Sequence, residues 1–477
     1  MKIHRGLWWT PNVPDQPIAG SLIVDQVEGI TLDLDCITSS EKAESLTDVV
    51  SMRHSTDVKP NLIVHGRSQE GVAFTLYNGF VRHAGDRSSG LSNALIYFNR
   101  GIEGWAFEDP TSVNVAKIHS RFHGLVAWMD HNPFKIEYRS RLRDTFITHK
   151  LPKAIRVQID PDRLLTLSWD RQGPTKSIIQ TEVNVHSTPA IGIEYSSPRS
   201  LDNAIDDLGI CGDLLTLLLG APTVGYDSEF FSSQAIRAIG KRRYPARLRP
   251  IGARFQLKDK LADWMPDDVL LPLPQLRSAL DQVFSKWFEL HKRCWAAINP
   301  YFASLRTPGP FVNDRFFALA SSAESLHRSL RPRRPPIPRA EWNRIREAVL
   351  ASVESHRREY VCSRLNFEKD LNYRDRLKEL ISRFPTLHAE VIGDSDLQEE
   401  FCDRVTSLRN IEAHKFDRKK SSTSGPAIEK LTAKLRVIID SWLLAECGIP
   451  GETIEASFRG NRRYWYYADN KTWPWNK

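Results

Sequence analysis

The sequence predicts an α+β protein with a β-rich N-terminal domain (sandwich- or barrel-like), a helical connector and an all-α C-terminal bundle. Two observations support this fold class. Apolar residues alternate with polar ones up to about residue 198, and beyond it they recur every three or four positions, as in amphipathic helices. The chain also has 477 residues, more than one hydrophobic core normally serves. We therefore expect domains at residues 1–198, 199–305 and 306–477.

Short alternating segments characterise the first domain. Gly, Asn and Asp punctuate them, as at Asn78-Gly79. Short strands with regular turns are typical of a sandwich or barrel. One helix is expected over residues 114–129. The clearest predicted strands are residues 30–35, 72–77, 164–169 and 191–195.

Helical periodicity begins at residue 199. The connector should contain a capped helix over 200–219, a proline-rich loop near 266–274 and a long helix from 276 to about 302. A turn at 306–310 sets the next boundary, since Pro308, Gly309 and Pro310 oppose helix formation.

The C-terminal domain is expected to be an up-and-down helix bundle, because its predicted helices are joined by short connections. The loop at 331–339 contains four prolines and cannot be helical. The predicted helices span residues 311–330, 340–365, 372–384, 395–416 and 425–447.

Composition narrows the class of protein. No run of eighteen apolar residues occurs, so no membrane span is expected, and the first nine residues lack the apolar core of a signal peptide. Six cysteines are scattered without a Cys-x-x-Cys pair, which argues against disulfides or a zinc ribbon and predicts a cytoplasmic protein. No phosphate-binding glycine loop or serine-esterase elbow is present, and no cofactor is expected.

The charge of the chain is compatible with a polyanionic partner. Its net charge is +8 and its pI about 9.1. Three of four basic clusters lie in the last third of the chain, although such runs are often only solvated surface. The C-terminal tail interleaves cations with aromatics and could stack bases or pack on its own bundle. The candidate RNA-binding residues are Lys415, Arg418, Lys419, Arg462 and Arg463.

One polar run in a predicted helix carries groups suited to cutting RNA without a metal: Arg409, Asn410 and His414. Histidine transfers protons near neutral pH, and the arginine fork holds a permanent positive charge against a phosphate. RNA supplies its own nucleophile, the ribose 2′-hydroxyl. The surrounding pattern also predicts a helix, with an N-cap cluster at 394–396 and an apolar stripe through Leu397, Phe401, Val405, Leu408 and Ile411.

The spacing of Arg409 and His414 is not unique. Similar pairs occur at Arg143–His149, in a β-rich stretch, and at Arg383–His388, where Pro385 interrupts any helix. A surface helix with a merely solvated arginine and histidine remains the alternative interpretation.

Several other segments accompany this motif. They are residues 6–9 and 20–22, 66–77, 122–128, 316–328 and 373–377. Together with Arg-Asn-x-x-x-His, they resemble the ApeA family of bacterial anti-phage proteins, whose C-terminal domain belongs to the HEPN superfamily of ribonucleases. The resemblance covers most of the chain, and residues 200–300 least well.

The resemblance implies an abortive-infection effector that cleaves structured RNA, such as transfer RNA, when a phage product triggers its N-terminal half. It also implies a homodimer or a higher homo-oligomer. At about 100° per residue, Arg409 lies about 140° from His414 around the helix. Either the long arginine side chain bends around the helix, or two copies of the helix pool their residues in one cleft, and the resemblance implies the second arrangement. His414 would then act as general acid or base, Arg409 would stabilise the transition state and Asn410 would position either group. The products would be 2′,3′-cyclic phosphate and 5′-hydroxyl ends.

Three further residues or pairs are weighed with the motif. Glu324 could brace the motif helix or simply be exposed, and Glu412 is interpreted as a solvated helix residue. His119 and His123 have metal-ligand spacing on the predicted 114–129 helix, but no acidic third ligand accompanies them, so no metal site is predicted. Two other functions stay open: a non-catalytic HEPN-like adaptor for dimerisation or RNA binding, and a ligand-binding β module with a helical dimeriser.

Overall fold

The computed structural model describes residues 1–464 apart from ten internal segments. Those segments are residues 26–27, 38–61, 87–91, 140–143, 175–182, 253–265, 308–310, 332–337, 366–370 and 415–423. The chain divides into two compact units. The first contains Met1–Leu215 and Thr223–Asp263, and the second contains Thr216–Pro222 and Trp264–Lys477.

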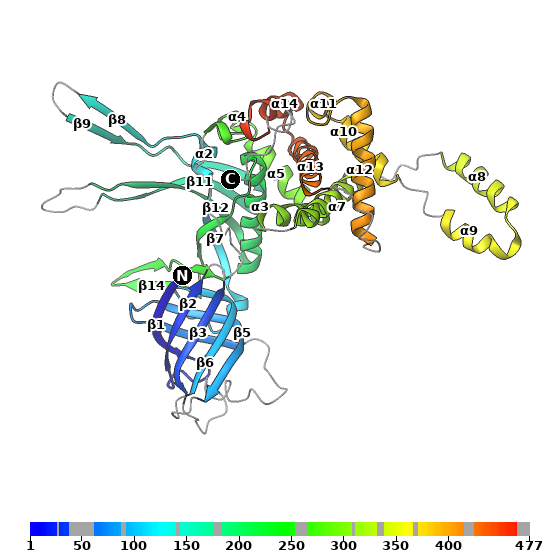
Figure 1. Cartoon of the computed structure of the whole chain (residues 1–477). Helices are drawn as coiled ribbons and strands as arrows, with labels where there is room; N and C mark the ends of the chain where they lie inside the picture. Colours follow the sequence, from blue (N-terminus) through cyan, green and yellow to red (C-terminus); the bar gives the residue numbers. More distant parts are fainter. Residues whose placement is uncertain are drawn as a thin grey trace. The chain divides into compact units, whose positions relative to one another are not determined.

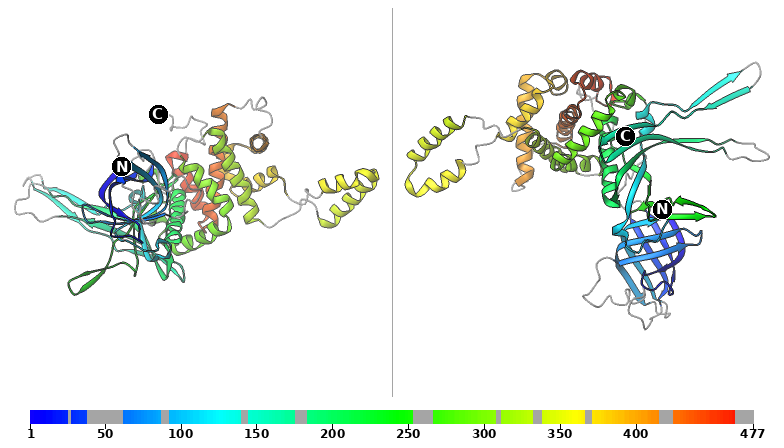
Figure 2. Two further views of the ribbon diagram at one scale, coloured as in Figure 1. Left: turned by 90° about the horizontal axis from the view of Figure 1, so that it is seen from below. Right: turned by 180° about the vertical axis from the view of Figure 1, so that it is seen from behind.

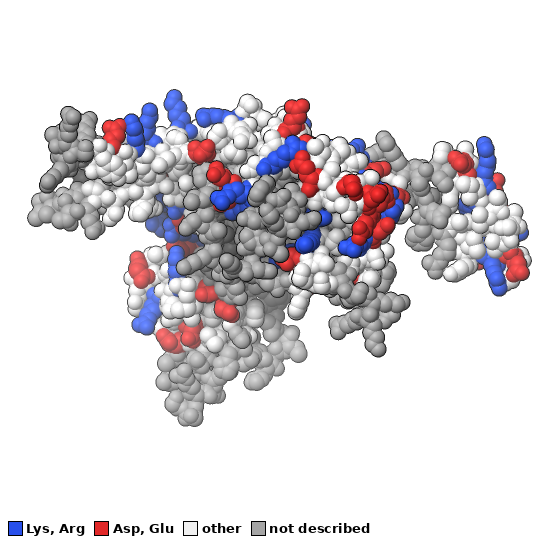
Figure 3. Space-filling view, turned by 45° about the horizontal axis from the view of Figure 1, so that its top comes forward, with Lys and Arg blue, Asp and Glu red and all other residues white. Residues whose placement is uncertain are grey.

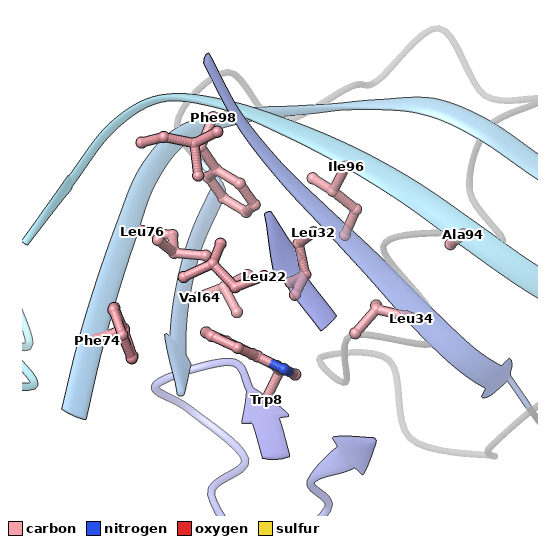
Figure 4. Close-up of a cluster of buried hydrophobic side chains, with 11 residues drawn as sticks. Trp8, Leu22, Leu32, Leu34, Val64, Phe74, Leu76, Ala94, Ile96 and Phe98 are labelled. Atoms are coloured by element: carbon pink, nitrogen blue, oxygen red, sulfur yellow. The ribbon is translucent and has the colours of Figure 1, made fainter. Parts of the chain in front are cut away.

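A closed six-stranded antiparallel barrel forms the N-terminal part of the first unit (Figure 1). The strands follow the order β6-β3-β2-β1-β4-β5, and β5 pairs back with β6. Figure 4 shows Trp8, Leu22, Leu32 and Phe74 meeting inside it. The barrel prediction is thereby confirmed. The strands are β1 (Lys2–Trp9), β2 (Ile18–Asp25), β3 (Gly29–Ile37), β4 (Leu62–Ser68), β5 (Ala73–Asp86) and β6 (Ser92–Glu103).

Gly66 and the dipeptide Asn78-Gly79 shape this barrel. The Trp8 ring occupies the space of a side chain at Gly66, because a Cβ there would come within 2.0 Å of the indole. Asn78-Gly79, expected to mark a turn, lies inside β5, where Asn78 has φ of 57°. The register of β5 with β4 shifts between Leu76 and Gly79, as at a β-bulge, and its register with β6 shifts further along, between Val81 and His83. The dipeptide therefore bends a long strand instead of ending it.

A second, five-stranded sheet follows in the order β10-β11-β12-β7-β13. Two separate hairpins, β8–β9 and β14–β15, accompany it, and β16 (Arg249–Ile251) joins the barrel beside β6. The elements of the sheet are β7 (Asn114–Phe122), β10 (Ile155–Asp160), β11 (Arg163–Gln172), β12 (His186–Ser200) and β13 (Gly225–Phe231). The hairpin strands are β8 (Phe134–Arg139), β9 (Asp144–His149), β14 (Ile236–Ile239) and β15 (Arg242–Pro245).

The helix predicted over 114–129 is wrong for most of its length. Residues 114–122 form strand β7, and only α2 (Leu125–Met129) is helical. Ile118, Ser120 and Phe122 alternate on the buried face of the sheet. Buried Ser120 is tolerated there because its hydroxyl hydrogen-bonds the Tyr226 carbonyl at 3.2 Å and the Ser228 hydroxyl at 2.8 Å.

Among its described residues, the predicted connector is helical only toward its two ends, and β13–β16 lie between them. Its first helix, α3 (Leu201–Leu219), agrees with the prediction, and the hydroxyl of Ser200 accepts a hydrogen bond from the Asn203 amide. The predicted long helix is interrupted at Cys294 and follows a short one. The helices are α4 (Leu273–Leu276), α5 (Leu280–Arg293) and α6 (Trp295–Arg306). The boundaries at 198 and 305 stay predictions.

The remaining helices of the second unit follow the prediction with three differences. The segment 340–365 is two helices, and α11 and α14 were not expected. Pro385 ends one helix and begins the next, since α10 stops at Ser382 and Pro385 is the first residue of α11. The helices are α7 (Val312–Leu330), α8 (Arg339–Ser352), α9 (Arg358–Leu365), α10 (Tyr373–Ser382), α11 (Pro385–Ile392), α12 (Ser395–His414), α13 (Gly425–Glu446) and α14 (Gly451–Gly460).

Helix α7 contacts α6, α10, α12 and α13, and the motif helix α12 is packed by α7, α10 and α11. A buried carboxylate also ties this unit together: Asp440 accepts hydrogen bonds from the hydroxyls of Tyr301 and Tyr464. Among the described helices, none is long and apolar enough to cross a membrane.

Candidate active site

Helix α12 carries the motif, and local signals define where it begins. The carboxylate of Asp394 accepts the amide of Leu397 at 3.1 Å, which caps the first turn. Phe401, Val405 and Leu408 are buried, as the apolar stripe predicted. Leu397 departs from that stripe, because 48% of its surface is exposed.

The Arg409 guanidinium is held from α7 by the carboxylate of Glu324. Arg409 Nη2 lies 2.5 Å from Glu324 Oε2, and Arg328 Nη2 lies 2.8 Å from the other oxygen, Oε1. The Glu324 side chain is only 12% exposed and that of Arg409 27%. One largely buried carboxylate therefore binds two arginines, and the cluster keeps a net positive charge.

An aromatic ring lies against the same guanidinium. Arg409 Cζ is 5.6 Å from the centre of the Tyr373 ring, which α10 supplies. Burial raises the pKa of Tyr373, the nearby Glu324 carboxylate raises it further, and Arg409 opposes them, so the phenol stays neutral at physiological pH. Arg409 Nε is buried and has no partner among the described residues.

Two more contacts fix the end of α12. Arg409 Nη1 donates to Asn410 Oδ1 at 3.1 Å, while Asn410 itself is exposed. Asn313, at the start of α7, donates to Glu412 Oε1 at 2.8 Å. Glu412, interpreted from the sequence as solvated, is instead half-buried and joins two helices.

His414 is the last residue of α12, but its side chain lies outside the described part of the structure. Lys415, Arg418 and Lys419 also lie outside it. The structure thus brings together Arg409, Asn410 and Glu324, and it leaves the position of the imidazole as a prediction.

The second Arg-x-x-x-x-His pair has a structural role. Arg383 Nη1 pairs with Glu446 at 2.6 Å, and its Cζ lies 4.3 Å from the Trp442 ring centre. His388 is fully buried, with Nδ1 2.7 Å from the Ile381 carbonyl oxygen. Burial lowers the pKa of His388 to about 4, which keeps the ring neutral.

The other histidines considered from the sequence, His149, His119 and His123, lie in the first unit. Arg143 is outside the described residues, and Nε2 of its neighbour His149 lies 2.6 Å from the Ser187 hydroxyl. His119 approaches Glu229 at 3.5 Å, and His123 stacks on Tyr226, with 4.4 Å between ring centres. In the part of the chain that the structure describes, no group of three or more His, Cys, Asp or Glu could hold a metal ion.

The two described candidates for RNA binding in the tail differ. Arg462 is exposed, whereas burial lowers the pKa of half-buried Arg463. The adjacent Tyr464 is 4% exposed, so residues 461–464 pack on their own bundle. On the face drawn in Figure 3, acidic and basic side chains of the described residues lie interspersed, without a surface of one sign.

A buried histidine in the same helices was not singled out from the sequence. His327, one turn beyond Glu324, lies between Arg376 Nη1, 3.1 Å from its Nδ1, and Glu379 Oε2, 2.8 Å from its Nε2. Because arginine can only donate, Nδ1 accepts and Nε2–H donates to the carboxylate. Sequence signals for this neighbourhood did exist: Glu324 and Arg328 have i,i+4 spacing, and residues 316–328 and 373–377 belong to the segments that resemble the family, although neither His327 nor Tyr373 was assigned a role.

These observations define a class: a β-rich N-terminal region joined to a helical domain with a partly exposed arginine on its motif helix. Residues 3–287 match the family ApeA N-terminal domain 1, and residues 317–453 match the family Apea-like HEPN. HEPN domains are generally nucleases that act on RNA. No curated protein and no solved structure matches the chain.

The chain belongs to the ApeA family, because the first match alone covers more than half of it. The second match contains α12 and therefore the whole Arg409–His414 motif. The protein is accordingly an anti-phage HEPN effector.

Proposed function

We propose that this protein is a metal-independent endoribonuclease and that Arg409, Asn410 and His414 form its active site. The observation that carries the proposal is the setting of Arg409, a partly exposed guanidinium held by Glu324 within an Apea-like HEPN domain. The Arg409 guanidinium is held in place and is still partly exposed to solvent. It suits a phosphate ligand, because the arginine side chain needs little rearrangement when the phosphate binds.

The proposed reaction needs only groups of the chain, the RNA and water. The 2′-hydroxyl of a ribose attacks the adjacent phosphorus, its O–P bond forms, and the bond to the 5′-oxygen of the next nucleotide breaks. His414 accepts the hydroxyl proton or donates one to the leaving oxygen, and the imidazole of a second copy or a water molecule makes the other transfer. Arg409 neutralises charge on the pentacoordinate phosphate, and exposed Asn410 orients it. The products are 2′,3′-cyclic phosphate and 5′-hydroxyl ends, with transfer RNA the first substrate to test.

The active site is proposed to be composite, with two copies of α12 contributing. Glu324 binds Nη2 of Arg409, and the Tyr373 ring lies 5.6 Å from its Cζ. The remaining donor capacity of Arg409 would serve a phosphate beside His414 of the second copy. The β-rich region is proposed to sense a phage product that relieves a resting state in the cytoplasm.

Cleavage of RNA by the purified full-length chain in EDTA tests the proposal. Single substitutions Arg409→Ala and His414→Ala should each lower cleavage by about 10²–10³-fold, the usual cost of removing a group that stabilises charge in the transition state. The new ends should resist a phosphatase until a cyclic-phosphate-opening enzyme is added. The measurement is the mapped position and chemistry of RNA ends.

Arg404→Ala is the matched control. Arg404 lies on the same helix, is 63% exposed and pairs only with Glu400 four residues earlier among the described residues. Its loss should leave cleavage unchanged. If all three variants cleave like the parent, or if the parent cleaves no RNA even in phage-infected cells, the domain is a non-catalytic adaptor and the proposal fails.

A further inference from the structure

The largest local excess of basic residues in the sequence lies far along the chain from the motif. Residues 230–258 contain eight basic residues and no Asp or Glu, so this stretch alone carries +8, the net charge of the whole chain. Outside it, 58 of the 66 Lys and Arg remain and balance the 58 Asp and Glu. The eight are Arg237, Lys241, Arg242, Arg243, Arg247, Arg249, Arg254 and Lys258.

Much of this charge lies on a two-stranded ribbon, the β14–β15 hairpin, which projects from the body of the first unit (Figures 1 and 2). Every residue from 236 to 245 is exposed. An isolated hairpin gains little stability by itself, and this one buries neither face. The basic residues of this hairpin therefore contribute little to folding, and contact with another molecule explains them better.

The arginines of the stretch have two different settings. Arg249 contacts Glu229 at 3.0 Å and Glu103 at 3.7 Å, so its charge is compensated. In the described structure, the side chains of Lys241, Arg242 and Arg243 form no ion pair or hydrogen bond. These three cations at the ribbon tip are available to an external anion.

An aromatic side chain shares the ribbon face with one of these cations. The register pairs Arg237 with Tyr244 and Ile239 with Arg242, and directly opposed residues point to the same side. Tyr244 is 42% exposed. Arginine forks bind phosphates, and an exposed phenol ring can stack on a base, so the combination fits a nucleic acid strand better than an acidic protein.

We propose that the β14–β15 ribbon binds the phosphate backbone of RNA, as a second contact surface in addition to the Arg409 site. The choice of RNA over other polyanions as the ligand of the ribbon rests on the proposed function. The ribbon would raise affinity for long or structured RNA without touching the reacting phosphate.

Binding of labelled transfer RNA by full-length chain carrying Arg409→Ala, which prevents cleavage, tests the ribbon separately from the active site. Adding Lys241→Ser, Arg242→Ser and Arg243→Ser should weaken binding about tenfold or more at 0.15 M salt. It should also reduce the slope of log K against log salt by about 2, since each lost phosphate contact contributes about 0.7. Fluorescence anisotropy at several salt concentrations measures both.

Lys150→Ser, Lys153→Ser and Arg156→Ser provide the matched control, because these residues are exposed in the same unit and the net charge changes equally. Equal weakening by the two triple variants, or no weakening by either, overturns the ribbon proposal. So does a ribbon variant that keeps RNA affinity but loses binding of polyglutamate, which would assign the ribbon to an acidic protein partner. The proposed active site is tested separately, by comparing RNA cleavage by the parent chain with RNA cleavage by Arg409→Ala.

Discussion

Two stretches of the second unit have the same Arg-x-x-x-x-His spacing but differ in how helices carry the two residues. The side chains of Arg383 and Arg409 are equally exposed, at 27%, and each pairs with a glutamate. The difference lies beyond the arginines: His388 is buried on a separate helix, whereas His414 ends the helix that carries Arg409. Neither the spacing nor the exposure of the arginine separates the two stretches; the continuity of α12 and the burial of His388 do.

The largest effect is expected on stability, at the buried histidine. His388→Ala removes a filled ring volume and leaves the Ile381 carbonyl and Ser441 hydroxyl without their imidazole partner. A loss of roughly 2–4 kcal/mol follows from the cavity and the lost hydrogen bonds. Chemical denaturation followed by tryptophan fluorescence should show it, since Trp442 lies in the same core.

The same variant should keep RNA cleavage per folded molecule within about twofold at a temperature where it is folded. Loss of cleavage without loss of stability would mean that the Arg383–His388 pair, and not Arg409–His414, performs the chemistry.

A smaller effect is expected at the residue that holds Arg409. Glu324→Gln retains an oxygen acceptor but removes the charge that orders the guanidinium, so kcat for RNA cleavage should fall about tenfold, the loss of one charge-assisted contact. KM should change little, because Glu324 is a positioning residue covered by two arginines. Steady-state kinetics on one RNA separates these two parameters.

Glu412→Gln is the control for helix packing. Glu412 also joins α12 to α7, through Asn313, but contacts Arg409 in no hydrogen bond or ion pair of the described structure. Equal losses for the two variants would indicate that helix docking matters and that the Glu324–Arg409 contact itself does not.

Local patterns in the sequence predicted the motif helix well. Asp394 caps it and three of the stripe residues are buried, because both signals act within a few residues along the chain. The contacts that surround Arg409 were beyond such reasoning, since Glu324 and Tyr373 come from helices far away in sequence. From the sequence, Glu324 had two possible interpretations, as a residue that braces the motif helix or as an exposed residue.

The error at 114–129 has a specific physical cause. Val115, Ile118, Phe122 and Leu125 recur at three- and four-residue steps, which imitates a helix. In the structure, Ser120 occupies the buried strand position between two of them, and hydrogen bonds across the sheet offset its polarity. A pattern of apolar residues alone cannot reveal such a buried hydroxyl, because its partners lie about a hundred residues away.

The comparison of the two pairs also predicts a pH dependence of stability. The pKa of His388 is lowered to about 4 in the folded chain, below the usual value near 6.5 that the unfolded chain should have. Between these values the unfolded state binds the proton more strongly, so stability falls as pH decreases from about 6.5 to 4. His388→Asn cannot titrate and escapes this loss. Its stability deficit relative to the parent should therefore shrink by about 1 kcal/mol per pH unit in denaturation measured between pH 7 and 4. A deficit that stays constant would show that the buried ring is not the neutral structural group described above, and the contrast with His414 would lose its basis.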